Sequence, residues 1–308
     1  ADVRSLLAEL TPPLTLRGYR EVLGWEPAAR ERALAGARAA LAAAPPPVLA
    51  APGALLAGLS PHAPYSSHPA LVTACFDLAR ESALPVAMHL AESEAERRFL
   101  DAASGPFADL HARLGWTEPA AWSAAAPDGL GEWLASVPLA APLLLVHGTW
   151  LEPAEIARLA ARPATAIAYC PGSVPWFHGG ADPHPVVAML AAGLPVALGT
   201  DSLASSPTLN LPLTCTLARR AQPALGPEQI LWMATRAGAL ALGCPERGEL
   251  TAGGPADFVA FDLAGSRGGR RGALEAIEGA LLSGYRVPGL SVIGGIAHAF
   301  AALRPFPA

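Results

Sequence analysis

The sequence predicts an α/β fold in which parallel strands alternate with helices, as in a (β/α) barrel. From His62 to Asp201, short apolar runs alternate with segments of helical periodicity, and nearly every apolar run ends in a polar residue. Strands of a parallel sheet covered on both faces read as such continuous apolar runs. The chain shows no glycine-rich dinucleotide turn and no obvious switch point, so we favour a barrel over an open doubly wound sheet.

The N-terminal part of the chain predicts two strands, each followed by a helix. The first helix is rich in alanine and arginine and ends at Pro45, Pro46 and Pro47. The second strand leads directly into His62, and the second helix places small and apolar residues on one face. These four elements are expected, in chain order, at residues 14–23, 28–44, 54–61 and 69–82.

The stretch from Pro85 to Glu96 shows how such a strand would deliver catalytic groups. Four mainly apolar residues run into His89, and Glu92 then opens a polar segment that favours a helix. In (β/α) barrels the chemistry lies at the carboxyl ends of the strands. We therefore expect His89 at this edge of the sheet, with Glu92 in the turn beside it.

Later strands repeat this pattern. The run Leu143–His147 ends in a histidine, and the run Leu194–Asp201 ends in an aspartate. Another strand is expected at 164–170, and helices at 152–161 and 185–192 would connect the three. The histidine and the aspartate should therefore lie at the same edge of the sheet as His89.

The C-terminal part has a different character. A helical stretch at 227–242 closes the alternating repeat. Residues 248–262 then read as a turn and a short strand, and 290–300 adds further strand-like sequence. We expect a partial barrel over 1–244 and a small β-rich appendage over 245–308.

Composition limits the classes of partner. The formal net charge is -5, without a block of like charges, so neither nucleic acid nor a membrane is expected as a partner. With 52% hydrophobic and 15% charged residues the chain can bury a large core, and no apolar run is long enough to span a bilayer. A small-molecule substrate is the expected partner, and a homo-oligomer stays open.

Lysine is absent, so all 21 basic residues are arginine. This excludes Schiff-base catalysis, a P-loop lysine and a metal pair bridged by a carbamylated lysine. The four cysteines are far apart and form no paired motif, which favours a reduced, cytoplasmic interior. The sequence opens at Ala1 rather than at a methionine, and we expect a further segment upstream.

Four polar residues at strand ends form the candidate site: His89, Glu92, His147 and Asp201. Imidazoles and carboxylates are ligands of a zinc-type ion that keeps one position open for water, and such an ion lowers the pKa of that water towards neutrality. A neighbouring carboxylate can then carry a proton to a leaving group. Taken singly, each histidine is more simply explained as a hydrogen-bonded core residue, but packing does not explain the four together.

Other chemistries have weaker support. Cys170 also ends a strand but has no visible base beside it, and the chain lacks the GxSxG elbow of a serine hydrolase. We interpret the remaining histidines as structural, namely His68, His111, His178, His184 and His298. A long insertion at 105–138 carries three tryptophans that we interpret as a small core of their own, namely Trp116, Trp122 and Trp133.

Four motifs occur in an order that resembles the amidohydrolase superfamily. They are Ser60-Pro-His-Ala-Pro-Tyr-Ser66, His89-Leu-Ala-Glu92, Leu145-Val-His-Gly148 and Gly199-Thr-Asp-Ser-Leu-Ala-Ser-Ser206. The sequence is most similar to the chlorohydrolase and nucleobase-type deaminase branch, which includes S-adenosylhomocysteine, guanine, cytosine and aminofutalosine deaminases. The resemblance runs from Leu14 to Asp262 and implies a TIM (β/α)8-type metal-dependent hydrolase barrel.

The resemblance also implies residue roles. One divalent metal ion, zinc or else iron, would have His89 and Asp201 as ligands, and Asp201 would also take a proton from the activated water. Glu92 would contact the substrate, protonate its ring nitrogen and pass a proton to the leaving amine. His147 would orient the attacking water and stabilise the tetrahedral intermediate, and His62 would contact the substrate.

The chain departs from the family pattern in two places. It contains no His-x-His pair, which in the family supplies two metal ligands from the first strand, so we expect a barrel that lacks its first strands. Two expected ligands remain, and we therefore expect weak zinc binding or none. The segment Cys170-Pro-Gly-Ser-Val174 also lacks the arginine and asparagine that the family often has there.

The expected function is hydrolytic deamination of an aminated heterocycle or a nucleoside-like small molecule. A chlorohydrolase or an amide hydrolase would use the same activated water on another leaving group. The alternative from a different class is a truncated, non-catalytic barrel that binds a small molecule or a partner subunit, because six strands would leave two sheet edges to be covered.

Overall fold

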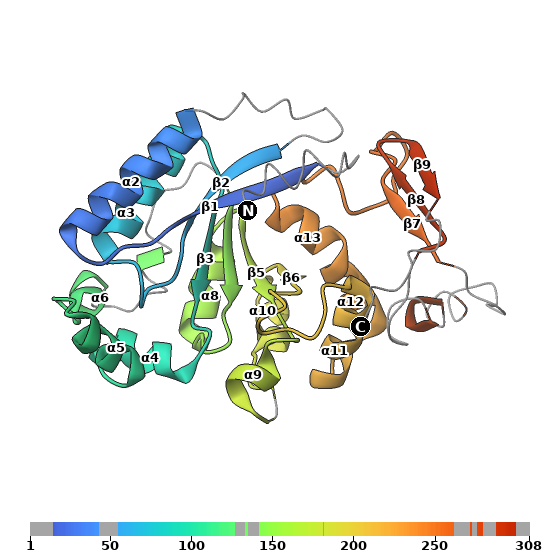
Figure 1. Ribbon diagram of the computed structural model, residues 1–308. Helices are drawn as coiled ribbons and strands as arrows, with labels where there is room; N and C mark the ends of the chain where they lie inside the picture. The colour runs from blue at the N-terminus through green and yellow to red at the C-terminus, as the bar shows by residue number, and fades with distance from the viewer. Residues whose placement is uncertain are drawn as a thin grey trace, which may run out of the picture.

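A six-stranded parallel sheet forms the centre of the molecule (Figure 1). The computed structural model describes residues 15–42, 55–126, 133–134, 142–180, 182–261, 272, 276–279 and 288–299. The strands are β1 (Leu16–Val22), β2 (Leu55–Pro61), β3 (Val86–Leu90), β4 (Leu143–His147), β5 (Thr165–Tyr169) and β6 (Val196–Leu198). They lie side by side in chain order. All six predicted strands are confirmed, although β6 is shorter than expected because Gly199 to Asp201 already belong to the loop.

The sheet has the strand order of a (β/α) barrel but is open. Within the described ranges, β1 pairs with β2 and β6 pairs with β5, and neither has a second strand neighbour. Each parallel connection carries helical segments, as parallel strands require. The α/β fold is therefore TIM-barrel-like, and the barrel does not close among the residues that the structure describes.

Most of the predicted helices are confirmed. The stretch predicted at 227–242 is two helices rather than one, because Thr235 has φ -126° and ψ -84°, outside the helical region. Four of the described helices were not predicted, namely α5 and α6 in the insertion after β3, the short α9, and α11. The helices are α2 (Pro27–Ala42), α3 (Pro69–Glu81), α4 (Glu94–Ala102), α5 (Pro106–Leu114), α6 (Ala121–Ala125), α8 (Pro153–Ala161), α9 (Val174–His178), α10 (Val186–Ala191), α11 (Leu211–Ala221), α12 (Pro227–Ala234) and α13 (Arg236–Ala241).

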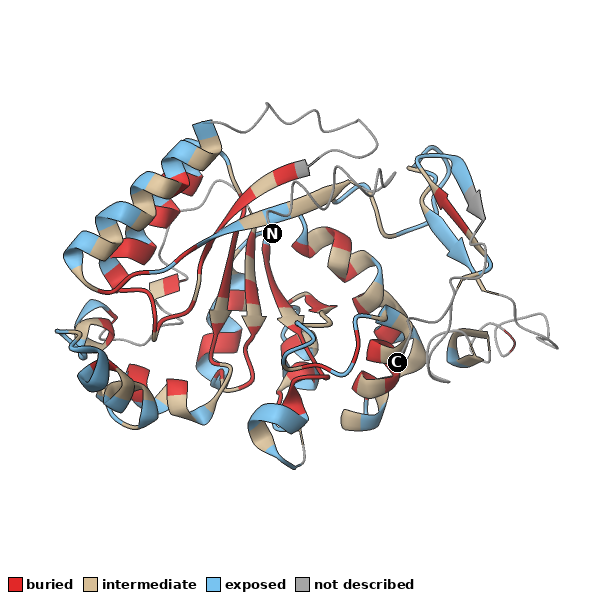
Figure 2. Cartoon of the chain, in the orientation of Figure 1, coloured by how far each residue is buried: buried red, intermediate tan, exposed pale blue. Residues whose placement is uncertain are grey.

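The core lies between the sheet and its helices, and Figure 2 shows β2 to β6 and the sheet-facing sides of the helices mostly buried, whereas β1 is mostly exposed or intermediate. The insertion after β3 adds an aromatic part to this core. Trp122 is 1% exposed, and its ring lies 5.3 Å from that of Trp133. The prediction that the tryptophans of the insertion are core residues is therefore confirmed for Trp122, while Trp116 and Trp133 are half-buried.

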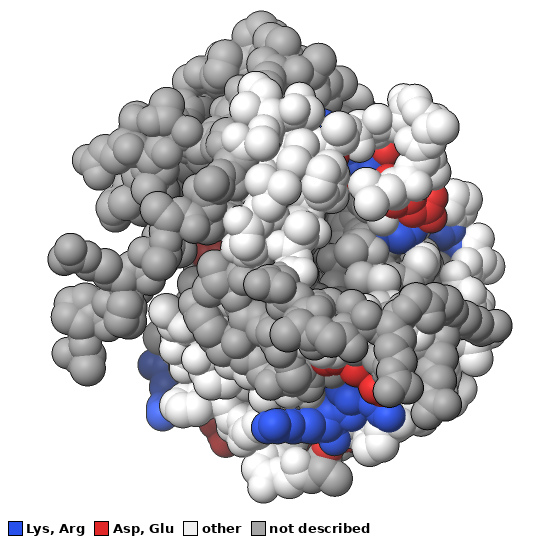
Figure 3. Space-filling model, turned by 90° about the vertical axis from the view of Figure 1, so that its right-hand side faces the viewer, with Lys and Arg blue, Asp and Glu red and all other residues white. Residues whose placement is uncertain are grey.

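A second sheet, antiparallel and three-stranded, lies beside α12 and α13 (Figure 1). Its strands are β7 (Phe258–Ala260), β8 (Leu290–Ile293) and β9 (Ile296–Ala299). They fall where β-rich sequence was predicted, while Asp262 and Phe300, the ends of the two predicted segments, lie outside the described residues. On the face in Figure 3, acidic and basic side chains lie in neighbouring groups. In the part of the chain that the structure describes, no helix is long and apolar enough to cross a membrane.

Candidate functional site

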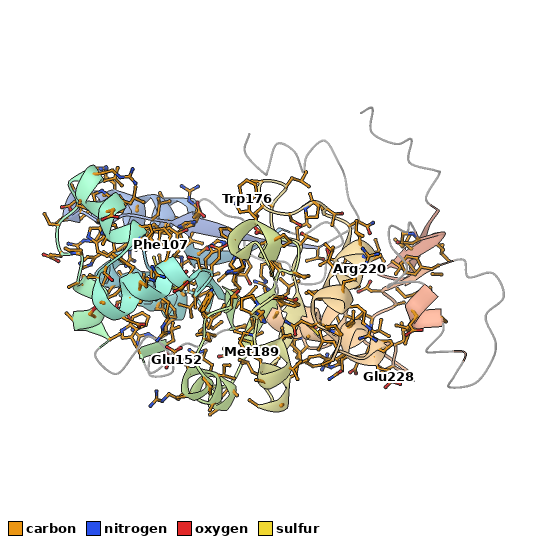
Figure 4. All side chains as sticks on the ribbon, turned by 90° about the horizontal axis from the view of Figure 1, so that it is seen from below. Phe107, Glu152, Trp176, Met189, Arg220 and Glu228 are labelled. Atoms are coloured by element: carbon orange, nitrogen blue, oxygen red, sulfur yellow. The ribbon has the colours of Figure 1, made fainter. Side chains whose placement is uncertain are left out.

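The predicted site residues lie at the carboxyl ends of the parallel strands. In the β3 and β4 pairing, His89 lies opposite Val146 and Leu90 opposite His147, so the two strands end side by side. Figure 4 views the molecule from below, where α9, which carries Trp176, lies between α5, which carries Phe107, and α11, which carries Arg220. The loops and helices that follow the strands therefore surround this edge of the sheet.

His147 and Glu92 form a close polar pair. Nε2 of His147 lies 3.0 Å from Oε1 of Glu92, and both side chains are largely removed from solvent. His147 has a φ of 73° and Gly148 has a φ of 71°. Such left-handed backbone is unfavourable for a residue other than glycine and tends to mark functional sites. This turn directs the His147 ring from the end of β4 towards the loop after β3.

Asp201 is held by three donors. Its Oδ2 accepts hydrogen bonds from the hydroxyls of Ser173 and Ser205, each at 2.5 Å, and its Oδ1 accepts one from the Ser202 N–H at 2.7 Å. Partial burial raises the pKa of Asp201, but these hydrogen bonds outweigh burial and hold it below its ordinary value. The carboxylate is thus kept ionised and fixed in direction, as a metal ligand or a base requires.

The loops after β5 and β6 meet closely at Gly172. A Cβ atom there would lie 2.3 Å from Oγ of Ser206, closer than real side chains approach. A side chain at position 172 would therefore require Ser206 to move. Next to Gly172, Ser173 reaches Asp201 from the neighbouring loop. The segment Cys170-Pro-Gly-Ser that departs from the family pattern thus supports Asp201.

Three residues bring metal-compatible atoms together. One ligand atom each from Glu92, His147 and Asp201 lie within 4.8 Å of one another. Two carboxylates and an imidazole suit a zinc-type ion. His89, predicted as a ligand with Asp201, is not in this group. Its Nδ1–H donates to the His62 carbonyl at 2.9 Å, which leaves Nε2 with a free lone pair, as in many histidine ligands of metals.

The imidazole rings form a row along the strand ends. The ring centres of His62 and His89 are 5.0 Å apart, and those of His89 and His147 are 5.7 Å apart. His62 is hydrogen-bonded to Ser66 at 2.6 Å and lies 3.9 Å from Glu21 at the end of β1. Burial and the neighbouring His89 lower the pKa of His62, so this ring is favoured in its neutral form. The structure therefore brings all five predicted site residues to one edge of the sheet.

A small pocket, with a volume of about 10 Å³, lies beside the Glu92 and His147 pair. Burial raises the pKa of the Cys170 thiol, so Cys170 stays a neutral thiol, in line with the prediction that it is no nucleophile. His178 and His184, which the sequence analysis interpreted as structural, also contribute to the lining. The pocket is lined by Glu92, His147, Thr149, Tyr169, Cys170, Ser173, Val174, Phe177, His178 and His184.

Glu96 is a residue that the sequence analysis left without a role. Its side chain is fully buried and accepts hydrogen bonds from the N–H groups of Ala91 at 3.1 Å and Glu92 at 2.9 Å. Burial raises its pKa to about 7. The signal available in the sequence was its place three residues after Ser93, the N-cap of α4. Glu96 fixes the turn that presents Glu92.

Comparisons with known proteins agree with this geometry. The profile of the Amidohydrolase family matches residues 18–284. The 5-methylthioadenosine/S-adenosylhomocysteine deaminase of Desulfovibrio desulfuricans is 36% identical over 215 residues, which are 67% of this chain and 43% of the relative. The aminodeoxyfutalosine deaminase of Deinococcus radiodurans is 33% identical over 201 residues, which are 60% of this chain and 45% of the relative. The chain thus spans under half the length of these relatives.

Solved structures show the same fold. The crystal structure of Helicobacter pylori aminofutalosine deaminase in complex with methylthio-coformycin superimposes with a TM-score of 0.79 at 23% identity and covers 96% of this chain and 69% of that chain. The triazine hydrolase from Arthrobacter superimposes with a TM-score of 0.69 at 22% identity, over 96% of this chain and 62% of that chain. At this identity the two structures establish the fold alone. Together with the family match over most of the sequence, they lead to one conclusion: the chain belongs to the amidohydrolase family.

Proposed function

We propose that the chain carries the site of a metal-dependent hydrolase that deaminates an aminated heterocycle or a nucleoside-like small molecule. The observation that carries this proposal is the polar pair of Glu92 and His147, at 3.0 Å, beside the ionised Asp201. A carboxylate and an imidazole in contact can move a proton, and a second carboxylate kept ionised can accept one. Hydrolytic loss of an amine needs both steps.

Each residue of the site has a role in the proposed reaction. A divalent metal ion held by Asp201, with His89 or with the Glu92 and His147 pair, would lower the pKa of water and so supply the nucleophile. Asp201 takes the proton of that water, because three donors keep it ionised. Glu92 protonates the substrate ring nitrogen and returns a proton to the leaving amine. His147 orients the attacking water, and His62 contacts the substrate.

The relatives support the substrate class. Those that match more than half of the chain include deaminases of methylthioadenosine, S-adenosylhomocysteine and aminodeoxyfutalosine. The second candidate is hydrolysis of a chlorinated or alkylamino-substituted triazine. It is favoured by the 38% identity, over 164 residues, to the hydroxydechloroatrazine ethylaminohydrolase of a Pseudomonas strain.

The organisation that goes with this function is also a proposal. We infer a partial TIM barrel over 1–244 that lacks the first strands of its family, and an appendage over 245–308. The open edges at β1 and β6 support a homo-oligomer or another cover, since such edges need one. They also support the non-catalytic alternative, in which the chain only binds. A reduced, cytoplasmic location fits the four free cysteines.

Ammonia release tests the proposal. The full chain, supplied with zinc, is assayed on methylthioadenosine, S-adenosylhomocysteine and a chlorinated triazine, alongside Glu92→Gln and Asp201→Asn. We expect ammonia from a nucleoside and a loss of about 10²–10⁴-fold in kcat in each variant, the usual weight of a positioned acid or base. The exposed Asp77, which pairs with Arg80 at 2.8 Å, provides Asp77→Asn as the matched control. Activity that survives both site variants, or chloride release alone, would overturn deamination.

A further inference from the structure

The left-handed turn at His147 is held by another histidine. His184 lies in the loop before α10 and is 4% exposed. Its Nε2 lies 2.7 Å from the carbonyl oxygen of His147. A carbonyl can only accept a hydrogen bond, so the proton is on Nε2 of His184. This bond fixes the peptide unit that directs the His147 ring towards Glu92.

The loop that carries His184 is braced on several sides. Asp182 accepts hydrogen bonds from the Tyr169 hydroxyl and, at 2.9 Å, from the N–H of His184. Gln222, the C-cap of α11, donates to the His184 carbonyl at 3.2 Å. The ring of His184 lies 4.3 Å from the ring of Tyr169. A braced support, rather than a mobile loop, therefore holds His147.

The Nδ1 atom of His184 indicates that packing alone does not explain a histidine at this position. Nδ1 of His184 is buried and has no hydrogen-bond partner in the described part of the chain. Burying a polar atom without a partner is unfavourable, and a phenyl ring would avoid that cost in similar space. What a phenyl ring lacks is the Nε2–H that His147 receives.

We propose that His184 is a positioning residue, which acts through the His147 carbonyl to hold the His147 ring against Glu92. The inference rests on the proposed function only for its effect on turnover. Its structural part, the dependence of the His147 ring on His184, stands apart from any reaction. The bond joins the loop after β5 to the end of β4, so it also ties two neighbouring strand ends of the site together.

His111 offers a matched control elsewhere in the molecule. It is 1% exposed, its Nε2 donates to the Tyr65 carbonyl at 2.7 Å, and its Nδ1 has no partner among the described residues. Both histidines are thus buried, donate a hydrogen bond from Nε2 to a backbone carbonyl, and have an Nδ1 atom without a partner among the described residues. They differ in the carbonyl that they hold. A general effect of replacing a buried histidine by phenylalanine should therefore be the same at both positions.

The test compares His184→Phe, His184→Gln and His111→Phe in the full chain by NMR of histidine ring nitrogens labelled with ¹⁵N. We expect the His147 ring signals to move in His184→Phe, to stay in His111→Phe, and to return towards wild type in His184→Gln, whose amide can donate. In the ammonia assay, kcat should fall at least about tenfold in His184→Phe with KM little changed, by analogy with other supporting residues of a site.

Unchanged His147 signals in a folded His184→Phe protein would overturn the inference, and so would equal changes in His111→Phe. If His184→Phe fails to fold, His184→Leu replaces it as the variant without a donor: its His147 signals should move while those of His184→Gln stay, and unchanged signals in both would overturn the inference. If the wild-type chain released no ammonia, the proposed function would be wrong, but the NMR comparison could still be made. Failure of the proposed function and failure of this inference can therefore be distinguished.

Discussion

Several groups of the site are held in place by hydrogen bonds with neighbouring residues. Asp201 is held by Ser173 and Ser205, and the backbone of Glu92 is held by Glu96. His89 is oriented by its hydrogen bond to the His62 carbonyl. Preorganised donors and acceptors of this kind cost no reorganisation during the reaction. The orientation of His89 is the feature at this scale that most directly concerns the metal.

His89→Asn tests that feature. The hydrogen bond at Nδ1 leaves Nε2 free to coordinate, so loss of the ring should weaken zinc binding by about 10-fold or more if His89 is a ligand. Competition with a chromogenic zinc chelator measures the affinity. An unchanged affinity would contradict this role and assign the ion to Glu92, His147 and Asp201 instead.

At the scale of elements, the insertion after β3 is fastened to the loop after β2. The Trp122 N–H donates to the carbonyls of Pro64 and Ser67 at 2.7 and 3.1 Å. His111 of α5 donates to the Tyr65 carbonyl in the same loop. This loop connects β2 to α3, so α5 and α6 fasten the insertion to that connection.

Trp122→Ala should lower the free energy of unfolding by about 3–5 kcal/mol, because it leaves a cavity in the core. Trp122→Phe should cost less, since it keeps most of the apolar contact and removes one donor from two carbonyls. Urea unfolding followed by circular dichroism measures both. Trp176, which is 71% exposed, is the control, and Trp176→Ala should change the free energy of unfolding by less than about 0.5 kcal/mol. Equal effects at the two tryptophans would refute the fastening role.

The contribution of His111 to the stability of the fold depends on pH. Burial lowers the pKa of His111, although the hydrogen bond to Tyr65 opposes the change. The unfolded chain therefore binds this proton more readily than the folded chain. The resulting stability is present above the ordinary histidine pKa, about 6.5, and is lost as pH falls through the lowered folded value.

His111→Phe should lack this component. The melting temperature of the variant relative to wild type should therefore rise as pH is lowered from neutrality to below about 6.5. Thermal unfolding of both proteins across that range measures the difference. A difference that stays constant with pH would show that His111 does not titrate on unfolding.

Strands and helices with a local sequence pattern were predictable from the sequence. Features that depend on the backbone conformation or on contacts between segments distant in the sequence were not. Strand ends such as His89 and His147 were predictable, because apolar runs stop at a polar residue. The break at Thr235 and the support from His184 were not, since they depend on backbone angles and on a contact between loops. Glu96 did carry a local signal, its place three residues after the N-cap Ser93, but that signal alone does not reveal its bonds to the turn at Glu92. The interpretation of Trp122 as core was correct, because large aromatic residues are buried on average.

At the scale of the whole molecule, the site extends across the entire sheet. Glu21 comes from β1, His62 follows β2, His89 and His147 end β3 and β4, and Asp201 follows β6. Its geometry therefore depends on the register of every strand, although the sheet is open between β6 and β1 among the described residues. A ligand that binds this folded edge should also stabilise the sheet as a whole.

The central claim is that this edge of the sheet forms one metal site that depends on Asp201. Zinc titration of the metal-free chain by isothermal calorimetry tests it most directly, with Asp201→Asn and the surface variant Asp77→Asn beside wild type. The sequence alone led us to expect weak zinc binding or none. Because the structure groups Glu92 and His147 with Asp201, we now predict one weakly bound ion per chain in wild type and in Asp77→Asn, and none in Asp201→Asn. Absence of saturable binding in wild type, or binding that Asp201→Asn leaves unchanged, would contradict the claim.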